Sequence, residues 1–565
     1  MTDSRDALID YIRSNVIGAE EMVDGPFGPR PVVYADYTAS GRALSFVEDY
    51  IRDAVLPLYA NTHTESSGTG RQTSRFREDA RESIRRSVGA SAEHAVIFCG
   101  SGATYAIDKL VHVLGLRITS TLDDRFHLSD AIPVSQRPVV FIGPYEHHSN
   151  EVAWRESIAD VITIPEDADG HIDLTRLDDE LARHADRELK IGSFSAASNV
   201  TGITTDVAAV ATLMHRHDAL SFWDYAAAAP YVAIDMGSPA NGNLAYLDAI
   251  FLSPHKLVGG PGTPGVLVGR TELFTNRVPV VPGGGTVTYV NPAEHEFIPG
   301  TDHHGIEHRE EGGTPAIVDS VRAGLVFQLK DAVGADEIQR REGAFARRAI
   351  EAWSDHPHIG ILGSKHAERL SIVSFVIRHG DRYLHHNFVV AVLNDVFGIQ
   401  SRGGCSCAGP YGHRLLGIDL DRSHMFQREI GRGCEGIKPG WVRVGFNYFL
   451  DDATFDYTVD AVRLVADGAA ALLPLYRFDP ATGIWRHRNS TCTQSMSLDD
   501  VSYAQSRMNF PLRTRRTKVN ALPQFLARAE AIMTEASHTP ASSFDRPEAT
   551  DEFEQLRWFS YAGDP

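Results

Sequence analysis

Short apolar runs alternate with helical stretches over the first part of the chain, from residue 32 to about residue 334. The apolar runs expected as strands are 139–142, 161–164, 191–196, 219–223, 249–252 and 266–268. Between them, 76–88, 105–114 and 207–217 have the composition and spacing of helices. This alternation predicts an α/β domain with a mostly parallel sheet. In such a sheet, ligands collect on the loops that follow the carboxyl ends of the strands.

The pattern changes near residue 335, where we expect a domain boundary. Long helices are predicted over 316–333 and 337–353, and the second is rich in charge and expected to bridge to another unit. A smaller α/β domain follows, with strands at 370–377 and 441–446 around a helix at 388–397. Beyond residue 451 the pattern is helical to 475, irregular from 476 to 516 and helical again over 522–534. The expected division is an N-terminal arm (1–30), a large domain (31–335), a small domain (336–455) and a C-terminal extension (456–565).

Charge and composition narrow the class of partner. The chain has 565 residues and a formal net charge of -20, which opposes general binding to nucleic acid or to anionic membranes. Small molecules or other proteins are the expected partners. Residues 1–18 contain no secretory signal, and no run of about 18 apolar residues suggests a membrane span, so a cytoplasmic protein is expected. Five cysteines spread over so long a chain favour reduced thiols over a disulfide framework.

One lysine stands at a place where chemistry is expected. The stretch Ser253-Pro254-His255-Lys256 follows the short apolar run 247–252 and precedes a glycine-rich turn. A lysine among apolar residues must extend to solvent, pair or lose its proton, and a neutral amine is what Schiff-base formation with an aldehyde requires. The alternative is a surface lysine beside a turn.

A second stretch, Gly100-Ser101-Gly102-Ala103-Thr104, lies between an apolar run and a predicted helix. Small residues at such a turn allow backbone N–H groups to meet a phosphate at the helix N-terminus, and hydroxyls add further donors. Many helices begin in this way without binding an anion, so the stretch alone leaves both interpretations open.

Two further strand ends carry polar side chains. In Glu146-His147-His148-Ser149-Asn150, a histidine after a strand can stack on a planar ring or relay protons, whereas the alternatives are a hydrogen-bonded loop or a metal ligand. We expect no metal, because other ligands at zinc spacing are missing. Asp224 ends the apolar run before it, where an acid needs a partner such as a protonated pyridine nitrogen. A helix N-cap is the alternative.

The last stretch is the loop Arg402-Gly403-Gly404-Cys405-Ser406-Cys407-Ala408-Gly409-Pro410. Glycines make it flexible, and a neighbouring cation favours the thiolate form that a cysteine nucleophile needs. A metal-binding pair or a redox disulfide between Cys405 and Cys407 would also fit these residues.

Taken in order, these motifs resemble the class V aminotransferase superfamily, and within it the cysteine desulfurase and selenocysteine lyase branch. The resemblance covers about residues 30 to 450. The matching positions are Gly102-Ala103-Thr104, 146–150, Ser198-Asn199-Val200-Thr201-Gly202, Asp224, Ser253-x-His255-Lys256, Gly312-Gly313-Thr314-Pro315, 402–410 and Arg443. It implies a fold type I enzyme that uses pyridoxal 5′-phosphate (PLP), with a mostly parallel sheet of seven strands between helices, a smaller α/β domain and a homodimeric assembly.

The resemblance also implies roles for single residues. Lys256 would bind PLP covalently and later move the Cα proton of the substrate, His147 would stack on the ring, and Asp224 would pair with the ring nitrogen. The other implied cofactor-binding residues are Gly102, Ala103, Thr104, Asn199, Ser253, His255 and the partner subunit's Thr314. Asn199 and Arg443 would position an amino-acid substrate, with assistance from Arg402.

In the implied reaction, the Cys407 thiolate attacks the sulfur of a substrate cysteine, or of a related sulfur or selenium amino acid. Alanine leaves, and a persulfide on Cys407 passes its sulfur to a protein acceptor in sulfur metabolism. Cys405 resembles the first cysteine of the Cys-x-Cys pair in molybdenum cofactor sulfurases of the same superfamily.

The sequence departs from the family pattern after Asp224, where Ala227 stands in place of a glutamine that donates to the phenolic oxygen of PLP. Ala103 likewise replaces a common threonine. The alternatives are therefore a β-lyase, an epimerase or a transaminase that needs no thiol, because the fold does not fix the reaction. A non-catalytic scaffold of the same fold is a third alternative. The residues beyond 455 have no counterpart in short desulfurases.

Overall fold

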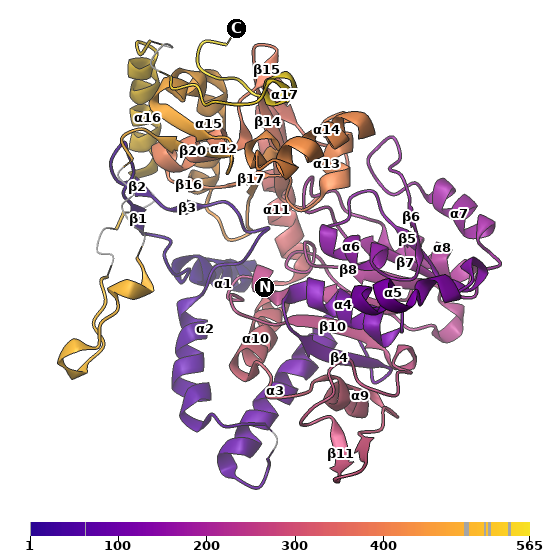
Figure 1. Ribbon diagram of the computed structural model, residues 1–565. Helices are drawn as coiled ribbons and strands as arrows, with labels where there is room; N and C mark the ends of the chain where they lie inside the picture. The colour runs from indigo at the N-terminus through magenta and orange to yellow at the C-terminus, as the bar shows by residue number, and fades with distance from the viewer. Residues whose placement is uncertain are drawn as a thin grey trace. The chain divides into compact units, whose positions relative to one another are not determined.

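The computed structural model describes residues 2–62, 64–490, 496–512, 516–517, 521–540 and 544–564. The chain forms two compact units (Figure 1), each described here by itself. The first comprises Met1–Ile17, Tyr37–Gly343 and His366–Leu370, and the second Gly18–Asp36, Ala344–Lys365 and Ser371–Pro565. Cys492 lies outside the described residues, and the other four cysteines are free thiols. No helix among the described residues is long and apolar enough to cross a membrane.

A seven-stranded sheet forms the centre of the first unit. In spatial order its strands are β4 (His94–Cys99), β10 (Gly265–Arg270), β9 (Ala249–Leu252), β8 (Leu220–Asp224), β7 (Lys190–Ser195), β5 (Val139–Ile142) and β6 (Asp160–Thr163). Only β10 runs antiparallel to its neighbours, so the predicted mostly parallel α/β sheet is confirmed. The carboxyl ends of β4, β5, β7, β8 and β9 therefore meet at one edge.

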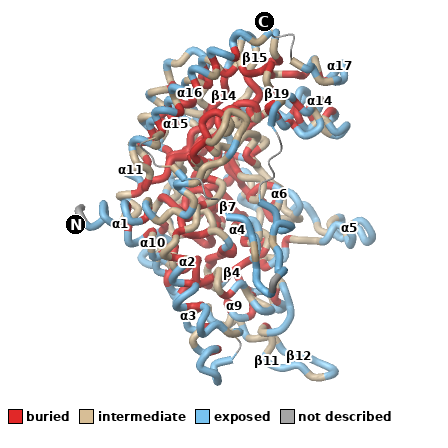
Figure 2. Tube along the Cα trace, turned by 90° about the vertical axis from the view of Figure 1, so that its left-hand side faces the viewer, coloured by how far each residue is buried: buried red, intermediate tan, exposed pale blue. Residues whose placement is uncertain are grey.

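Helices cover both faces of this sheet. Side chains of α4 (Gly102–Val113) and α6 (Val152–Arg155) share one buried cluster with Ile191 and other residues of that face. Helix α8 (Val207–Arg216) covers the opposite face. Gly192 faces away from its neighbour Ile191, because adjacent strand residues point to opposite sides of a sheet. A Cβ on Gly192 would lie 2.8 Å from the side chain of Met214 in α8. In Figure 2 the tube near β4 and β7 is coloured as buried, which places these strands in the interior of this unit. The remaining helices are α1 (Thr2–Ser14), α2 (Ser45–Tyr50), α3 (Gly68–Ser87), α5 (Ser120–Phe126), α7 (Leu174–Arg183), α9 (His303–Glu310) and α10 (Ile317–Val333), besides a hairpin of β11 (Val287–Val290) and β12 (His295–Phe297).

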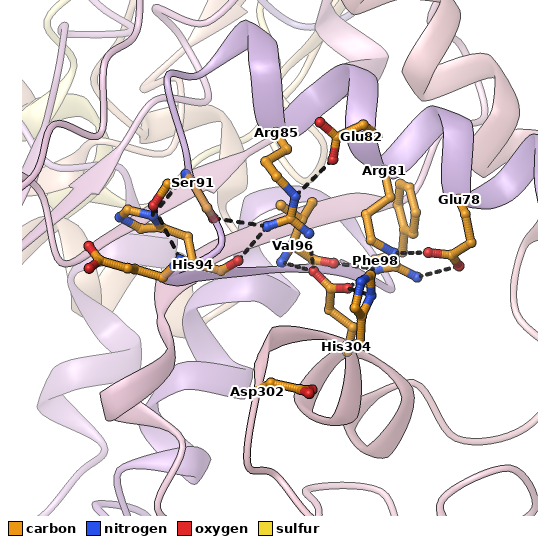
Figure 3. Close-up of polar contacts among 12 residues, drawn as sticks. Glu78, Arg81, Glu82, Arg85, Ser91, His94, Val96, Phe98, Asp302 and His304 are labelled. Atoms are coloured by element: carbon orange, nitrogen blue, oxygen red, sulfur yellow. Dashed lines mark hydrogen bonds and ion pairs between the residues drawn. The ribbon is translucent and has the colours of Figure 1, made fainter.

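The edge strand β4 is closed by charged side chains instead of another strand (Figure 3). Arg81 and Arg85 of α3 donate to the backbone oxygens of Val96 and His94. Glu307 accepts from the Val96 N–H at 2.8 Å, and Glu311, just after α9, accepts from the Phe98 N–H at 2.6 Å. Arg81 pairs with Glu311 and Arg85 pairs with Glu307, so the buried charges compensate one another. The same four side chains bind the backbone groups that the open edge of β4 would otherwise leave unpaired.

The second unit holds a smaller antiparallel sheet. Its strands, in order, are β13 (Ile359–Ile361), β14 (Ile372–His379), β18 (Trp441–Gly445) and β17 (Arg402–Gly404), with β15 (Arg382–Tyr383) paired to β14. Helices α12 (His386–Val392), α13 (Gly409–Leu415), α14 (Leu420–Gly431), α15 (Asp452–Gly468), α16 (Leu522–Ala536) and α17 (Asp551–Leu556) accompany it. The N-terminal segment adds β1 (Met22–Val23), β2 (Arg30–Pro31) and β3 (Val33–Tyr34), and β3 pairs with β16 (Ile399–Gln400). Helix α11 (Ala335–Ser354) begins in the first unit and ends in the second.

The region after residue 455 packs into the core of this second unit. Phe525, Phe553 and Tyr561 are buried in the same cluster as Val442 of β18. The stretch from 476, expected to be irregular, contains the hairpin of β19 (Tyr476–Asp479) and β20 (Ile484–His487). That expectation was wrong because each strand has only four residues, too few for their alternation to stand out, although Tyr476 and Phe478 face the core and Gly483 supplies a turn with φ of 69°.

Candidate active site

The lysine turn begins where β9 ends. Ser253 follows the last strand residue, and a 3-10 turn over Pro254–Lys256 carries the lysine onto the sheet edge. The neighbouring loop fixes this turn, because the Gly41 N–H donates to the His255 backbone oxygen at 2.8 Å. A Cβ on Gly41 would lie 2.0 Å from the Leu257 oxygen, so only glycine permits this approach.

Asp224 ends β8, the neighbouring strand, and is buried. Burial raises the pKa of the Asp224 carboxyl, whereas a hydrogen bond from the Ala226 N–H at 2.8 Å and the Lys256 ammonium oppose the rise. Lys256 and Asp224 thus interact electrostatically within the same site. A buried acid of this kind favours a cationic partner, and a protonated ring nitrogen has that character.

The turn before α4 meets the lysine turn directly. The Ala103 N–H donates to Ser253 Oγ at 2.9 Å, and Gly102 has a φ of 58°, a conformation that favours glycine. A Cβ on Gly102 would lie 2.9 Å from Ser253 Oγ and 3.8 Å from His255 Nε2. The N-terminus of α4, with its positive end of the helix dipole, therefore faces Ser253 and His255.

His147 is connected to the same turn through one serine. The Ser149 N–H donates to His147 Nδ1 at 3.2 Å, which leaves the proton of the neutral ring on Nε2. Ser149 Oγ lies 3.0 Å from His147 Nδ1 and 2.7 Å from Thr104 Oγ1. His147, the expected stacking residue, and Thr104, the expected phosphate-binding threonine, are thus linked by hydrogen bonds through Ser149.

His255 is kept neutral by its position. Burial first, and the Lys256 ammonium second, lower the pKa of His255 to about 4. Its Nδ1 lies 3.3 Å from Ser40 Oγ, and the Ser40 hydroxyl donates to the His255 backbone oxygen at 3.1 Å. Near neutral pH the imidazole therefore offers a neutral hydrogen-bonding group beside the α4 N-terminus.

Sequence reasoning assigned no role to Glu146, although it stands beside His147. Its carboxyl accepts hydrogen bonds from the Ser195 N–H at 2.9 Å, Ser195 Oγ at 2.6 Å, Asn150 Nδ2 at 2.7 Å and the Gly143 N–H at 3.2 Å. Burial raises the pKa of Glu146 to about 7, although the hydrogen bonds from Ser195 and Asn150 act to lower it. This carboxyl ties the ends of β5 and β7 together beneath His147. A glutamate placed just after an apolar strand was the signal that could have revealed it.

Asn199 and Thr314 occupy different surroundings within the first unit. Asn199 is buried in the loop after β7, where Ser198 Oγ accepts from the N–H groups of Val200 and Thr201. Thr314 is exposed, and its hydroxyl accepts a hydrogen bond from Asn61 Nδ2 at 3.1 Å. Asn199 thus belongs to the sheet edge, while Thr314 presents its hydroxyl at the surface.

The second unit carries the other expected site residues. Arg402 of β17 is the direct cross-strand partner of Arg443 of β18, so both side chains lie on one face of the sheet. Arg443 is buried and pairs with Asp36 at 2.8 Å. Two cations side by side with one acid leave a positive local charge, which suits the carboxylate of an amino acid.

Cys407 lies in a strained loop between β17 and α13. Ser406 and Cys407 adopt φ angles of 52° and 56°, and both are residues that rarely enter this left-handed region. The Ala408 N–H donates to the Cys405 oxygen at 3.1 Å and closes the turn. Both cysteines are partly exposed free thiols.

The residues of the first unit fit PLP. Ser253, His255, Thr104 and the N-terminus of α4 supply neutral donors for a phosphate, and Gly102 leaves the space that a Cβ would fill. The buried Asp224 carboxyl suits the ring nitrogen, and Lys256 lies close enough to act on its pKa. Ala227 is buried and has no side-chain donor for the phenolic oxygen.

The model of the aminotransferase class-V family matches residues 33–448, and the chain belongs to this family. Two curated relatives are similar over most of their length. The probable cysteine desulfurase of Halalkalibacterium halodurans is 27% identical over 393 residues, covering 69% of this chain and 87% of the relative. The cysteine desulfurase of Dickeya dadantii is 27% identical over 439 residues, covering 76% of this chain and 96% of the relative.

Solved structures share the fold. The cysteine desulfurase from Thermococcus onnurineus NA1 superposes with a TM-score of 0.61 at 21% identity, covering 77% of this chain and 95% of that chain. A cysteine desulfurase from Escherichia coli gives a TM-score of 0.58 at 20% identity, covering 76% of this chain and 94% of that chain. At these identities the likeness supports the α/β architecture alone.

Proposed function

We propose that this protein is a PLP-dependent cysteine desulfurase that removes sulfur from L-cysteine or a related amino acid. The gathering of Lys256, Asp224 and the α4 N-terminus at one sheet edge carries the proposal. Curated relatives that bear this activity in their names support it. The proposed assembly is a cytoplasmic homodimer, in which the partner subunit's Thr314 completes the phosphate site, and a protein accepts the sulfur.

The proposed roles in the first unit follow from the site geometry. When bound, PLP supplies an electron sink for negative charge at the substrate Cα. Lys256 would hold PLP and then carry the Cα proton, while the buried Asp224 carboxyl would keep the ring nitrogen protonated. His147 would stack on the ring, with its orientation fixed by Ser149.

The proposed sulfur transfer uses the second unit. Arg443 and Arg402 would bind the substrate carboxylate, and Asn199 would help to orient the amino acid. The Cys407 thiolate would attack the substrate sulfur, forming an S–S bond as the Cβ–S bond breaks. The bonding electron pair passes to Cβ, which gains a proton to give alanine, and Cys407 keeps a persulfide. The oxidation levels balance, because the two sulfur atoms together lose two electrons on forming the S–S bond and Cβ gains two electrons on exchanging its bond to sulfur for a bond to hydrogen.

Product analysis of the purified holoenzyme tests this proposal. With L-cysteine and a reducing thiol, wild-type protein should form alanine and sulfide in equal amounts. Cys407→Ala should abolish both products, whereas Cys405→Ala, two residues away in the same loop, is the matched control and should retain them. Retained turnover of amino acids by Cys407→Ala would instead indicate a thiol-independent enzyme: sulfide with pyruvate would indicate a β-lyase, and turnover without sulfide an epimerase or a transaminase. Failure of the wild-type protein to take up PLP would instead support the alternative of a non-catalytic scaffold.

A further inference from the structure

The C-terminal tail that follows α17 is a built-in part of the second unit. It lies beyond residue 448, where the family match ends, and Figure 1 shows α17 close to β15. The Tyr383 N–H donates to the Trp558 oxygen at 3.2 Å, and the Ser560 N–H donates to the Tyr383 oxygen at 2.9 Å. Phe559 pairs with Tyr383 as a parallel bridge and is fully buried. The tail is therefore joined to β15 by one parallel bridge.

Trp558 of this tail covers two adjacent histidines at the start of α12. Its ring stacks on His385 and His386 at centroid distances of 5.3 and 5.7 Å, both with an interplanar angle of 22°. Its Nε1–H donates to the Ile437 oxygen at 3.0 Å. Burial lowers the pKa of His386 to about 4 and holds that of His385 well below its usual value, so near neutral pH the stack consists of uncharged rings.

His386 in turn packs under the strand that leads to the cysteine loop. A Cβ on Gly403 would lie 3.1 Å from His386 Nδ1, and a Cβ on Gly440 would lie 2.6 Å from His386 Cδ2. The edge of the His386 ring thus occupies the space that side chains at Gly403 and Gly440 would otherwise fill. Because this approach is so close, a shift of His386 must move Gly403 and the residues after it.

A second contact secures the same strand from the C-terminal region. Asn387 Nδ2 donates to the Gly483 oxygen in the β19–β20 turn at 2.8 Å. A Cβ on Gly403 would lie 2.7 Å from Asn387 Oδ1, so this side chain also touches the start of the loop. Two of the α12 side chains that lie against β17, His386 and Asn387, are therefore contacted by residues beyond the family match.

We propose that the C-terminal region positions the Cys407 loop, with Trp558 acting as a positioning residue through His386. This inference rests on the proposed function. A non-glycine residue in the left-handed region is strained, so Ser406 and Cys407 keep their conformation only while the surrounding structure enforces it. The stack of Trp558 on His386 supplies that support at the base of the loop.

The test compares Trp558→Ala with Trp558→Phe in holoenzyme carrying Cys405→Ser, so that Cys407 is the one thiol of its loop. Phe544→Ala is the matched control, because Phe544 is a half-buried aromatic of the same region that contacts Trp485 and Tyr561. Four quantities are measured: the PLP absorbance band, kcat and KM for alanine formation, and the rate of Cys407 alkylation by iodoacetamide, followed by mass spectrometry.

In Trp558→Ala, iodoacetamide should alkylate Cys407 about fivefold faster than in the parent enzyme, and kcat should fall about tenfold. KM and the PLP band should stay unchanged. Trp558→Phe keeps a stacking ring and should return towards wild type. If Trp558→Ala does not fold, His386→Gln is measured in its place and should show the same two changes.

Alkylation and kcat in Trp558→Ala equal to those in Phe544→Ala would overturn the inference. Failure of the proposed function has a different signature, because wild-type protein would then form no alanine while the alkylation rates still report on the loop.

Discussion

Ser253 Oγ accepts a hydrogen bond from the Ala103 N–H at 2.9 Å, which joins the lysine turn to the N-terminus of α4. The two residues are far apart in sequence, yet β9 and β4 are separated by β10 alone in the sheet. This bond fixes the distance between the place where PLP would bind covalently and the place where its phosphate would lie. It makes Ser253 a sensitive position for cofactor affinity.

Ser253→Ala should therefore weaken PLP binding about tenfold, because the buried Ala103 N–H loses its acceptor and the phosphate loses a hydroxyl. Titration of apoenzyme with PLP, followed by absorbance, measures the change. Ser238→Ala is a suitable control, since Ser238 also accepts a backbone N–H, from Ala240, in a loop that carries no site residue. Equal affinities for the two variants would remove Ser253 from the cofactor site.

Glu146→Gln should lower both stability and cofactor affinity. The carboxyl accepts four hydrogen bonds, whereas a glutamine amide must point its NH2 group at two of these donors, of which only Ser195 Oγ can turn to accept. We expect a loss of about 1 to 3 kcal/mol in the free energy of unfolding, together with a shifted PLP band as His147 reorients. Urea unfolding and the absorbance spectrum check the two effects. An unchanged spectrum would restrict Glu146 to a structural role.

The pH dependence of stability should contain a contribution from Glu311. Burial would raise the pKa of this carboxyl, but Arg81 and Arg77 outweigh burial and lower the pKa to about 2. The stabilisation is present above the unfolded pKa of about 4.3 and is lost as the pH falls through about 2, and its size is on the order of 3 kcal/mol.

Urea unfolding from pH 7 down to pH 3 tests this contribution. Wild type should lose stability below about pH 4.3, whereas Glu311→Gln should be less stable at pH 7 and lose less on acidification, because the carboxylate whose protonation weakens the pairing with Arg81 is already absent. Glu552→Gln removes an exposed partner of Arg432 and should leave the profile nearly unchanged. Parallel pH profiles for wild type and Glu311→Gln would contradict the assignment.

Sequence reasoning predicted the parts of the fold that depend on local pattern. The alternation of apolar runs and helices was enough for the α/β class, and the strand ends that carry His147, Asp224 and Lys256 lie at one edge as predicted. The β19–β20 hairpin was not predicted, because its strands are too short for alternation to stand out.

Long-range contacts explain most of what the sequence did not predict. Nothing in the local pattern indicates that Glu311 caps the edge of β4, or that Trp558 stacks on His386, because each pair is distant in sequence. The left-handed backbone at Cys407 is similarly absent from the pattern, since a cysteine carries no preference for that region. The expected roles of all the site residues, Lys256 and Cys407 included, stay predictions.

The measurement that tests the central claim most directly is the mass of the Cys407 peptide after a single turnover. Holoenzyme is mixed with L-cysteine without an added thiol, alkylated and digested, and the peptide is sequenced by tandem mass spectrometry. The account predicts one extra sulfur atom on Cys407, one alanine released per site, and neither product in Lys256→Ala. Alanine release with an unmodified Cys407, or a persulfide that still forms in Lys256→Ala, would contradict it.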